Sequence, residues 1–119
     1  MIIDTIRQRI HAGLAIQKPE SKEQVVKGWG ERRGEPALVY RIPDHNKPGK
    51  YHEKGITESE WEQAYHQIMN SGEFSKPWFG TNMKGCACEG GCSFTTIGGI
   101  FVELGLACYY RRGVYRKRA

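Results

Sequence analysis

The sequence predicts a small α+β fold in a single domain, and three observations lead to this class. The chain has 119 residues, the length of one ordinary domain. Apolar side chains recur every three or four residues over 2–16 and 57–70, which is the spacing of helices buried on one face. Residues 25–43 are instead rich in valine and aromatic residues around a glycine-containing turn, which favours a β-hairpin.

The first half of the chain, residues 1–55, is expected to hold one helix and this hairpin. The helix is predicted over residues 2–16, because one face of it carries Ile3, Ile6, Ile10 and Leu14. Residues 17–24 have no apolar side chain except Pro19 and are expected to form a linker. The second hairpin strand is predicted near residues 37–42, and the segment "DHNKPGKYHEKG" after it is expected to be a polar loop.

The clearest start of a helix lies at Thr57. Thr57 and Glu60 fit a capping box, in which each side chain satisfies an otherwise unpaired backbone amide of the first helical turn. Ile56 and Trp61 stand at the positions of a hydrophobic staple. Gly72 suits the left-handed residue that ends many helices. We therefore expect one well-defined helix between these two signals.

The rest of the chain is expected to form short elements around a second helix. The segment "EFSKPWFGTNM" predicts a short strand or turn and then a short helix, with Pro77 in its first turn. The segment "SFTTIGGIFVELGLA" predicts the second helix, which Gly105 would end. The segment "YYRRGVYRKR" then predicts two strands joined by a tight turn at Arg112 and Gly113.

Gly98 and Gly99 lie in the middle of this second helix. A glycine there costs about 1 kcal/mol relative to alanine, so a close contact should compensate. We expect another helix to approach at these glycines, the one that carries Trp61. A nucleic-acid phosphate backbone is the alternative neighbour.

Positive charge is concentrated at the C-terminus. The chain has a net charge of +5. Residues 1–55 hold 11 basic against 7 acidic side chains, residues 56–108 hold 2 against 6, and residues 109–119 hold 5 against none. Three tyrosines are interleaved with these last basic residues, and aromatic side chains beside arginines suit nucleic-acid surfaces. A basic tail that is merely solvated is the alternative.

Several classes of function find no support in the sequence. No apolar run is long enough to span a membrane, and the N-terminus lacks the pattern of a signal peptide. We therefore expect a cytoplasmic protein with no membrane partner. No nucleophile elbow, phosphate loop or metalloprotease motif is present, so we predict no catalytic residues and no cofactor.

Three of the four cysteines lie close together in the segment "CACEGGC". Cys86, Cys88 and Cys92, with Cys108 or a histidine as the fourth ligand, would suit a zinc ion. Their spacing is not the paired C-x2-C of common zinc sites, and a redox thiol pair is a further alternative. We predict that the cysteines are reduced and bind no metal, and that Cys108 is buried in a strand.

The order of elements predicted over residues 56–118 is a helix, a short link, a short helix, a loop, a helix and a basic hairpin. This order resembles the winged helix-turn-helix family, on the segments "GEFSKPWF", "FTTIGGIFVELGLA" and "YYRRGVYRKR". The resemblance implies that the last helix enters the DNA major groove while the hairpin, called the wing, contacts the backbone or minor groove. In this sequence the groove-facing helix would run from Thr95 to Leu104 and the wing from Tyr109 to Arg118.

The resemblance implies a nucleic-acid-binding protein whose partner is duplex DNA. The groove-facing helix has no Arg, Lys, Asn or Gln to read base edges, so the wing should carry most of the binding through phosphates. The predicted nucleic-acid-binding residues are Thr95, Thr96, Arg111, Arg112, Tyr115, Arg116, Lys117 and Arg118. The habits of the family and the apolar N-terminal helix also favour a homodimer.

Two further interpretations stay open at this point. A winged helix also serves as a protein-interaction module, so the alternative function is that of a protein-interaction or structural module, with the basic tail incidental. The chain is also similar to small uncharacterised proteins of bacterial integron gene cassettes, on the segments "EKGITESEW", "CSFTTIGGIF" and "RRGVY". That similarity implies a mobile bacterial gene and no particular activity.

Overall fold

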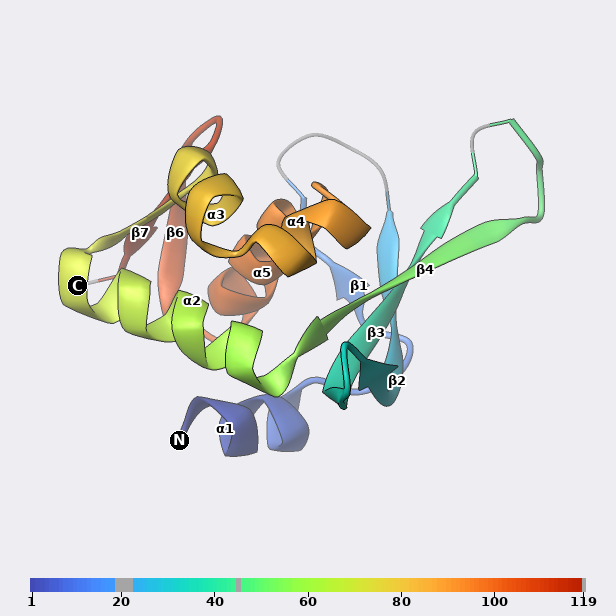
Figure 1. Cartoon of the computed structure of the whole chain (residues 1–119), viewed down its shortest axis with the longest axis horizontal. Coiled ribbons are helices and arrows are strands. Elements are labelled where there is room, and N and C mark those ends of the chain that lie inside the picture. Colours follow the sequence, from blue (N-terminus) through green and yellow to red (C-terminus); the bar gives the residue numbers. More distant parts are fainter. Residues whose placement is uncertain (19–22, 45, 119) are drawn as a thin grey trace.

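The computed structural model describes residues 1–18, 23–44 and 46–118, and it has the α+β fold that the sequence predicts. Its elements are α1 (Ile2–Arg9), β1 (Ala15–Ile16), β2 (Gln24–Arg32), β3 (Glu35–Pro43), β4 (Tyr51–Thr57), α2 (Glu58–Ser71), β5 (Glu73–Ser75), α3 (Lys76–Asn82), α4 (Lys84–Glu89), α5 (Ser93–Glu103), β6 (Ala107–Arg111) and β7 (Val114–Lys117). The antiparallel strands form one sheet in the order β1-β2-β3-β4 and a second in the order β5-β7-β6. Helix α5 lies between the two sheets (Figure 1).

The N-terminal helix is shorter than predicted, because α1 ends at Arg9 instead of continuing to residue 16. Gly13 adopts a left-handed φ of 94° and its amide donates to the Val26 carbonyl at 2.8 Å. The Val26 amide in turn donates to the Leu14 carbonyl at 2.9 Å. These bonds bring β1 beside β2, in the segment where the helix was expected to end. Residues 19–22 of the predicted linker lie outside the described residues.

The second half of the predicted polar loop is a strand. Every residue of β4 pairs with β3, from Tyr51 opposite Pro43 to Thr57 opposite Ala37. The carboxylate of Glu53 accepts hydrogen bonds from Lys27 at 3.0 Å and from Arg41 at 3.1 Å. These bonds, that from Lys27 first, lower the pKa of Glu53. Such cross-strand charge pairs stabilise a sheet whose residues have weak strand propensity, which is why composition alone predicted a loop.

Helix α2 begins and ends where the sequence predicts. The Thr57 hydroxyl accepts from the Glu60 amide at 3.3 Å, and the Glu60 carboxylate accepts from the Thr57 amide at 2.9 Å. Gly72 ends the helix with a left-handed φ of 85°. The short strand β5 and the short helix α3, with Pro77 in its first turn, are also confirmed.

The cysteine segment is helical where a loop was expected. Cys86 of α4 is fully buried, and this burial raises the pKa of its thiol to about 12. Cys88 is exposed, and so is Cys108 of β6, which was predicted to be buried. The structure describes all four cysteines, and each is a free thiol. Among the described residues, no three His, Cys, Asp or Glu side chains gather as a metal site.

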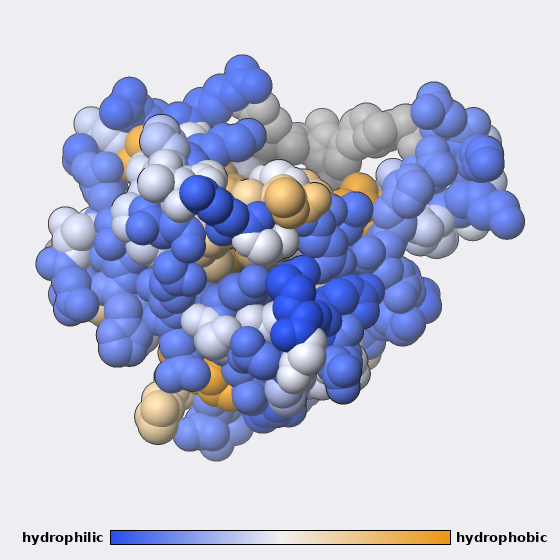
Figure 2. Space-filling view, viewed as in Figure 1, coloured by the Kyte–Doolittle hydropathy of each residue, from blue (hydrophilic) through white to orange (hydrophobic). Residues whose placement is uncertain are grey.

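The surface is mainly polar on the face that Figure 2 shows, where hydrophobic residues appear only as small separate areas. The described parts of the chain contain no helix that is both long enough and apolar enough to cross a membrane. The apolar side chains instead form one cluster that includes Ile6 of α1, Tyr40 of β3, Trp61 of α2 and Phe101 of α5. One hydrophobic core therefore joins both halves of the chain.

Close neighbours lie against both glycines in the middle of α5, but they do not belong to α2 as predicted. A Cβ atom on Gly98 would lie 2.2 Å from the ring of Tyr115, which belongs to β7. A Cβ atom on Gly99 would lie 2.4 Å from the carbonyl oxygen of Gln17, directly after β1. The two glycines therefore let a tyrosine ring and a backbone segment approach two neighbouring positions of one helix.

We expect that Gly98→Ala and Gly99→Ala each destabilise the protein by about 1–3 kcal/mol, because the added methyl group overlaps the Tyr115 ring or the Gln17 carbonyl group. Gly80→Ala is the control. An added Cβ at this exposed α3 position meets nothing within 4 Å, so alanine should leave stability unchanged or raise it through helix propensity. Urea denaturation of the three variants measures the difference, and an equal response at Gly80 and Gly98 would contradict this packing.

Candidate functional site

The basic hairpin β6–β7 has two faces of different character. The inner face packs on α5, where Tyr115 covers Gly98. Side chains alternate along a strand, so Arg116 points to the outer face. The turn between the strands contains Gly113 with a left-handed φ of 79°, as the predicted tight turn requires. Strand β7 is also the middle strand of its sheet, which fixes the hairpin to the body of the protein.

The outer face gathers arginines around one exposed tyrosine. The guanidinium of Arg116 lies 3.4 Å from the ring centroid of Tyr110, and that of Arg111 lies 6.0 Å from it. Arg116 also stands 3.7 Å from the carboxylate of Glu73, a weak pairing between two exposed groups. Tyr110 is itself 51% exposed. This face therefore presents arginine planes beside an aromatic ring, open to solvent.

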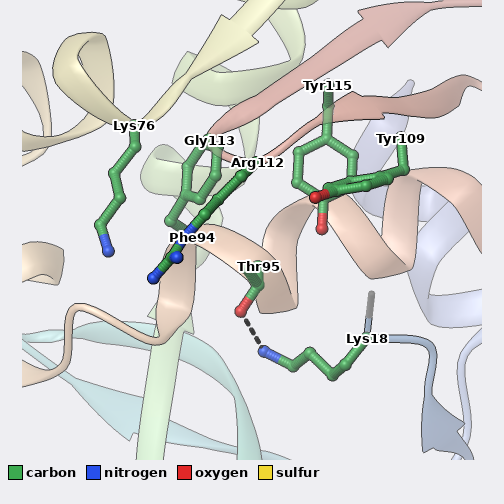
Figure 3. Close-up of a pocket in the computed structure, with 8 residues that line it drawn as sticks. All are labelled: Lys18, Lys76, Phe94, Thr95, Tyr109, Arg112, Gly113 and Tyr115. Atoms are coloured by element: carbon green, nitrogen blue, oxygen red, sulfur yellow. Dashed lines mark hydrogen bonds between the residues drawn. The ribbon is translucent and has the colours of Figure 1, made fainter. Parts of the chain in front are cut away.

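A pocket lies beside the inner face, with a volume of about 220 Å³. It is lined by Lys18, Lys76, Phe94, Thr95, Tyr109, Arg112, Gly113 and Tyr115. Figure 3 shows that the charged ends of the two lysines and the arginine point toward the same space beside Thr95. Three cations from three separate parts of the chain thus converge on one pocket whose walls are largely aromatic.

Lys18 is the most constrained of these cations. Its ammonium group donates to the Thr95 hydroxyl (Figure 3). It also donates to the Thr96 hydroxyl at 3.1 Å and to the Cys92 carbonyl at 3.3 Å. Burial lowers the pKa of this ammonium group to about 7. Sequence reasoning missed this residue, because it lies within the predicted linker and no motif surrounds it.

The predicted binding residues divide into exposed and buried groups. The exposed ones are Arg111, Arg112, Arg116, Lys117 and Arg118. Thr95 is half-buried in the pocket wall, and Thr96 is buried and donates to the side-chain oxygen of Gln24 at 2.6 Å. Tyr115 is only 1% exposed. We therefore leave Thr96 outside the candidate interface and place Tyr115 beneath it.

The helix expected to enter a DNA groove is the central helix of the fold. Eight residues of α5 are buried, among them both glycines, and the chain after β1 covers one of its faces. A helix needs an exposed stripe of side chains to lie in a major groove. The hairpin, with Tyr109 and Tyr110 of the predicted wing, and the pocket beside it offer the more accessible surface. Lys76 belongs to this surface as well, and the sequence did not single it out.

Comparisons with known proteins add no family to this geometry. The chain matches no protein-family model, no curated protein and no solved structure. Any function assigned to it therefore depends on its own side chains and their arrangement.

Lys18 should make the stability of the protein depend on pH. Its pKa is about 7 in the folded protein against a usual value of 10.5, so between these values the unfolded chain binds more protons. Its contribution to the free energy of unfolding should therefore rise as the pH increases from about 7 toward 10.

We expect the difference in stability between wild type and Lys18→Met to shift in favour of wild type between about pH 6 and pH 9, as the wild-type ammonium loses its proton. Thermal denaturation across this range measures the shift. Lys76→Met removes the same charge from an exposed lysine of the same pocket and is the control. A difference between wild type and Lys18→Met that stays constant with pH would contradict the burial of a charged group at this position.

Proposed function

We propose that this protein binds nucleic acid through the basic face, which consists of the hairpin β6–β7 and the neighbouring pocket. Its cations are Lys76, Arg111, Arg112, Arg116, Lys117 and Arg118, and Lys18 joins them where it is protonated, below about pH 7. The observation that carries this proposal is that cations flank both faces of one hairpin and accompany two exposed tyrosines, Tyr109 and Tyr110. Clustered arginines and lysines with accessible aromatic rings suit a polyanion made of bases and phosphates.

The order of elements supports this proposal. Helix α2 is followed by β5, the helices α3, α4 and α5, and then by the hairpin, and β7 lies between β5 and β6 in the sheet. Along the chain this order matches the one on which the resemblance to the winged helix-turn-helix family rests, with α4 in place of the expected loop. A hairpin in this position is the element by which such a domain reaches a nucleic-acid backbone.

The burial of α5 determines how the binding would work. With the helix covered, the hairpin contacts carry the interaction, and arginine matches phosphate oxygens with two parallel hydrogen bonds. Contacts to phosphates position a protein without reading sequence. We therefore propose binding that is strongly salt-dependent and has little sequence preference, because each phosphate contact releases counterions.

Changing Arg111, Lys117 and Arg118 together to glutamate should weaken nucleic-acid binding by more than about tenfold at low salt, because favourable phosphate contacts become repulsive. The slope of log affinity against log salt should also fall by about 0.7–0.9 for each phosphate that the variant no longer neutralises. Fluorescence anisotropy with a labelled oligonucleotide at several salt concentrations measures both quantities. All three residues are exposed, so the melting temperature should change little.

The matched control changes Lys47, Lys50 and Lys84 to glutamate. These exposed residues lie on the segment between β3 and β4 and on α4, so the variant has the same net charge but an intact hairpin. It should retain most of the affinity. An equal loss in both triple variants would show that only net charge matters and would exclude the hairpin as the site. Wild-type protein that fails to bind at low salt would favour the protein-interaction function instead.

A further inference from the structure

A groove runs along the inner face of the hairpin and consists of two adjoining hollows. The first is the pocket of about 220 Å³ in Figure 3. The second, about 160 Å³, is lined by Gln17, Lys18, Val102, Tyr109 and Tyr115. The two hollows share Lys18, Tyr109 and Tyr115. The groove therefore passes between the hairpin and the chain after β1, with α5 as its floor.

The groove is positively charged and carries no acidic side chain among the residues that line it. Lys76 and Arg112 stand at its end near the hairpin turn, and Lys18 stands where the two hollows meet. A recess with low-dielectric aromatic walls strengthens the field of these cations relative to open water. An anionic group such as a phosphate is the ligand that this end of the groove would favour.

The middle of the groove offers an aromatic surface. Tyr109 is 41% exposed and its ring meets that of Tyr115 edge to face, with the centroids 5.6 Å apart at 70°. The buried ring of Tyr115 supports the ring of Tyr109, while Tyr109 remains open to the groove. An exposed aromatic ring of this kind is suited to stack against a flat ligand. A flat ring beside a phosphate is the chemistry of a nucleotide.

The hydroxyl of Tyr115 gives a second, independent sign of a ligand. This hydroxyl is buried and has no hydrogen-bond partner among the described residues. Burial, together with the nearby Tyr109, raises the pKa of Tyr115 to about 12, so the hydroxyl keeps its proton and remains a donor.

Figure 3 shows the Tyr115 hydroxyl pointing from the hairpin toward the side on which Thr95 and Lys18 lie. The ring of Tyr109 lies against that of Tyr115 and is 41% exposed, so a ligand that displaces the Tyr109 ring would reach this donor. A buried polar group without a hydrogen bond costs free energy, and a ligand atom that accepts a hydrogen bond from this hydroxyl would remove that cost.

The size of the groove indicates whether it can hold an unpaired nucleotide or a base pair. Pockets for drug-sized ligands hold about 300–1,000 Å³, so a hollow of about 220 Å³ suits one small unit rather than a base pair. We propose that the groove holds one unpaired nucleotide unit, with its base against Tyr109 and its phosphate at Lys76 and Arg112. The protein accordingly prefers single-stranded nucleic acid to intact duplex, an inference that rests on the proposed function.

The experiment compares three probes at one low salt concentration by fluorescence anisotropy. The first two are a labelled oligothymidine of about 12 nucleotides and a blunt duplex of the same length. The third is unlabelled thymidine monophosphate, added as a competitor. We expect the single strand to bind at least about tenfold more tightly than the duplex, because only an unpaired base enters the groove and stacks. The monophosphate should displace the single strand and leave the duplex bound.

Two groove variants and one control separate the groove from the outer face. Tyr109→Ala removes the stacking ring, and Tyr115→Phe removes only the unpaired hydroxyl. Both should lower the ratio of single-strand to duplex affinity by about threefold to tenfold, because the groove takes only an unpaired base. Tyr51→Ala removes a 60% exposed tyrosine from β4 and should change neither affinity. If Tyr115 has a packing role alone, Tyr115→Phe will bind like wild type with equal or higher stability, and the assignment of its hydroxyl fails.

The outcomes distinguish this inference from the proposed function. Equal, salt-sensitive binding of single strand and duplex would overturn the nucleotide groove and leave the proposed function intact. Binding of neither oligonucleotide would overturn both. If neither oligonucleotide binds and calorimetry shows that thymidine monophosphate does, the groove is assigned to free nucleotides, and both the preference for strands and the proposed function are overturned. A preference that survives in Tyr109→Ala, with its melting curve unchanged, would also overturn the groove.

Discussion

The two adjacent glycines of α5 are the constraint on which the rest of the molecule depends. The absence of a side chain at Gly98 leaves room for the ring of Tyr115, and its absence at Gly99 leaves room for the backbone carbonyl of Gln17. One side chain larger than hydrogen at either position would push a whole element away from the helix. Because the two contacts come from opposite ends of the chain, they also join the two sheets through a single helix. The groove between Lys18 and the hairpin exists because both elements rest on that helix.

The distribution of charge follows from how the two halves meet. Three arginines of the first half pair with acids of the middle segment: Arg7 with Glu58 at 2.9 Å, Arg32 with Glu89 at 3.0 Å and Arg33 with Glu60 at 2.7 Å. Arg33 also donates to Glu89 and, at 2.9 Å, to the Gly55 carbonyl, so the β2–β3 turn is tied to α2, α4 and β4. These ion pairs neutralise part of the negative charge of the middle segment within the protein itself. Arg116 of the hairpin forms a weak pair with Glu73. Residues 109–119 hold five basic side chains and no acidic one, so positive charge dominates the surface of the hairpin.

Local signals in the sequence predicted the parts of the fold that depend on neighbouring residues. The structure has three such features: the capping box at Thr57 and Glu60, the left-handed Gly72 and the tight turn at Arg112 and Gly113. Each depends on residues only a few positions apart. The failures are long-range. Strand β4 forms because β3 and the charges around Glu53 lie beside it, and the helix predicted beyond Arg9 gives way to β1 because β2 provides partners for it.

The candidate site divides in the same way. Composition identified the basic hairpin, since five cations in eleven residues need no tertiary information. It could not identify Lys18, which joins the site only because β1 turns back toward α5, nor the burial of Thr96 and Tyr115. The residue pattern of a helix does not by itself show whether one of its faces contacts a DNA groove or the interior of the protein. The two glycines at the centre of α5 were the one sign of burial.

One hairpin can serve two chemistries because strand side chains alternate. Arg116 and Tyr110 share the outer face, where guanidinium groups in open water offer mainly electrostatic contacts that salt weakens. Tyr109 and Tyr115 share the inner face, where stacking and a buried hydroxyl depend on shape and are screened much less. The turn at Arg112 and Gly113 lies between the faces and lines the pocket, so a strand of nucleic acid held by phosphates on the outer side would pass the mouth of the groove. The burial of α5 leaves this helix unexposed and unable to read base edges, and it also supplies the floor of the groove beside the proposed phosphate contacts.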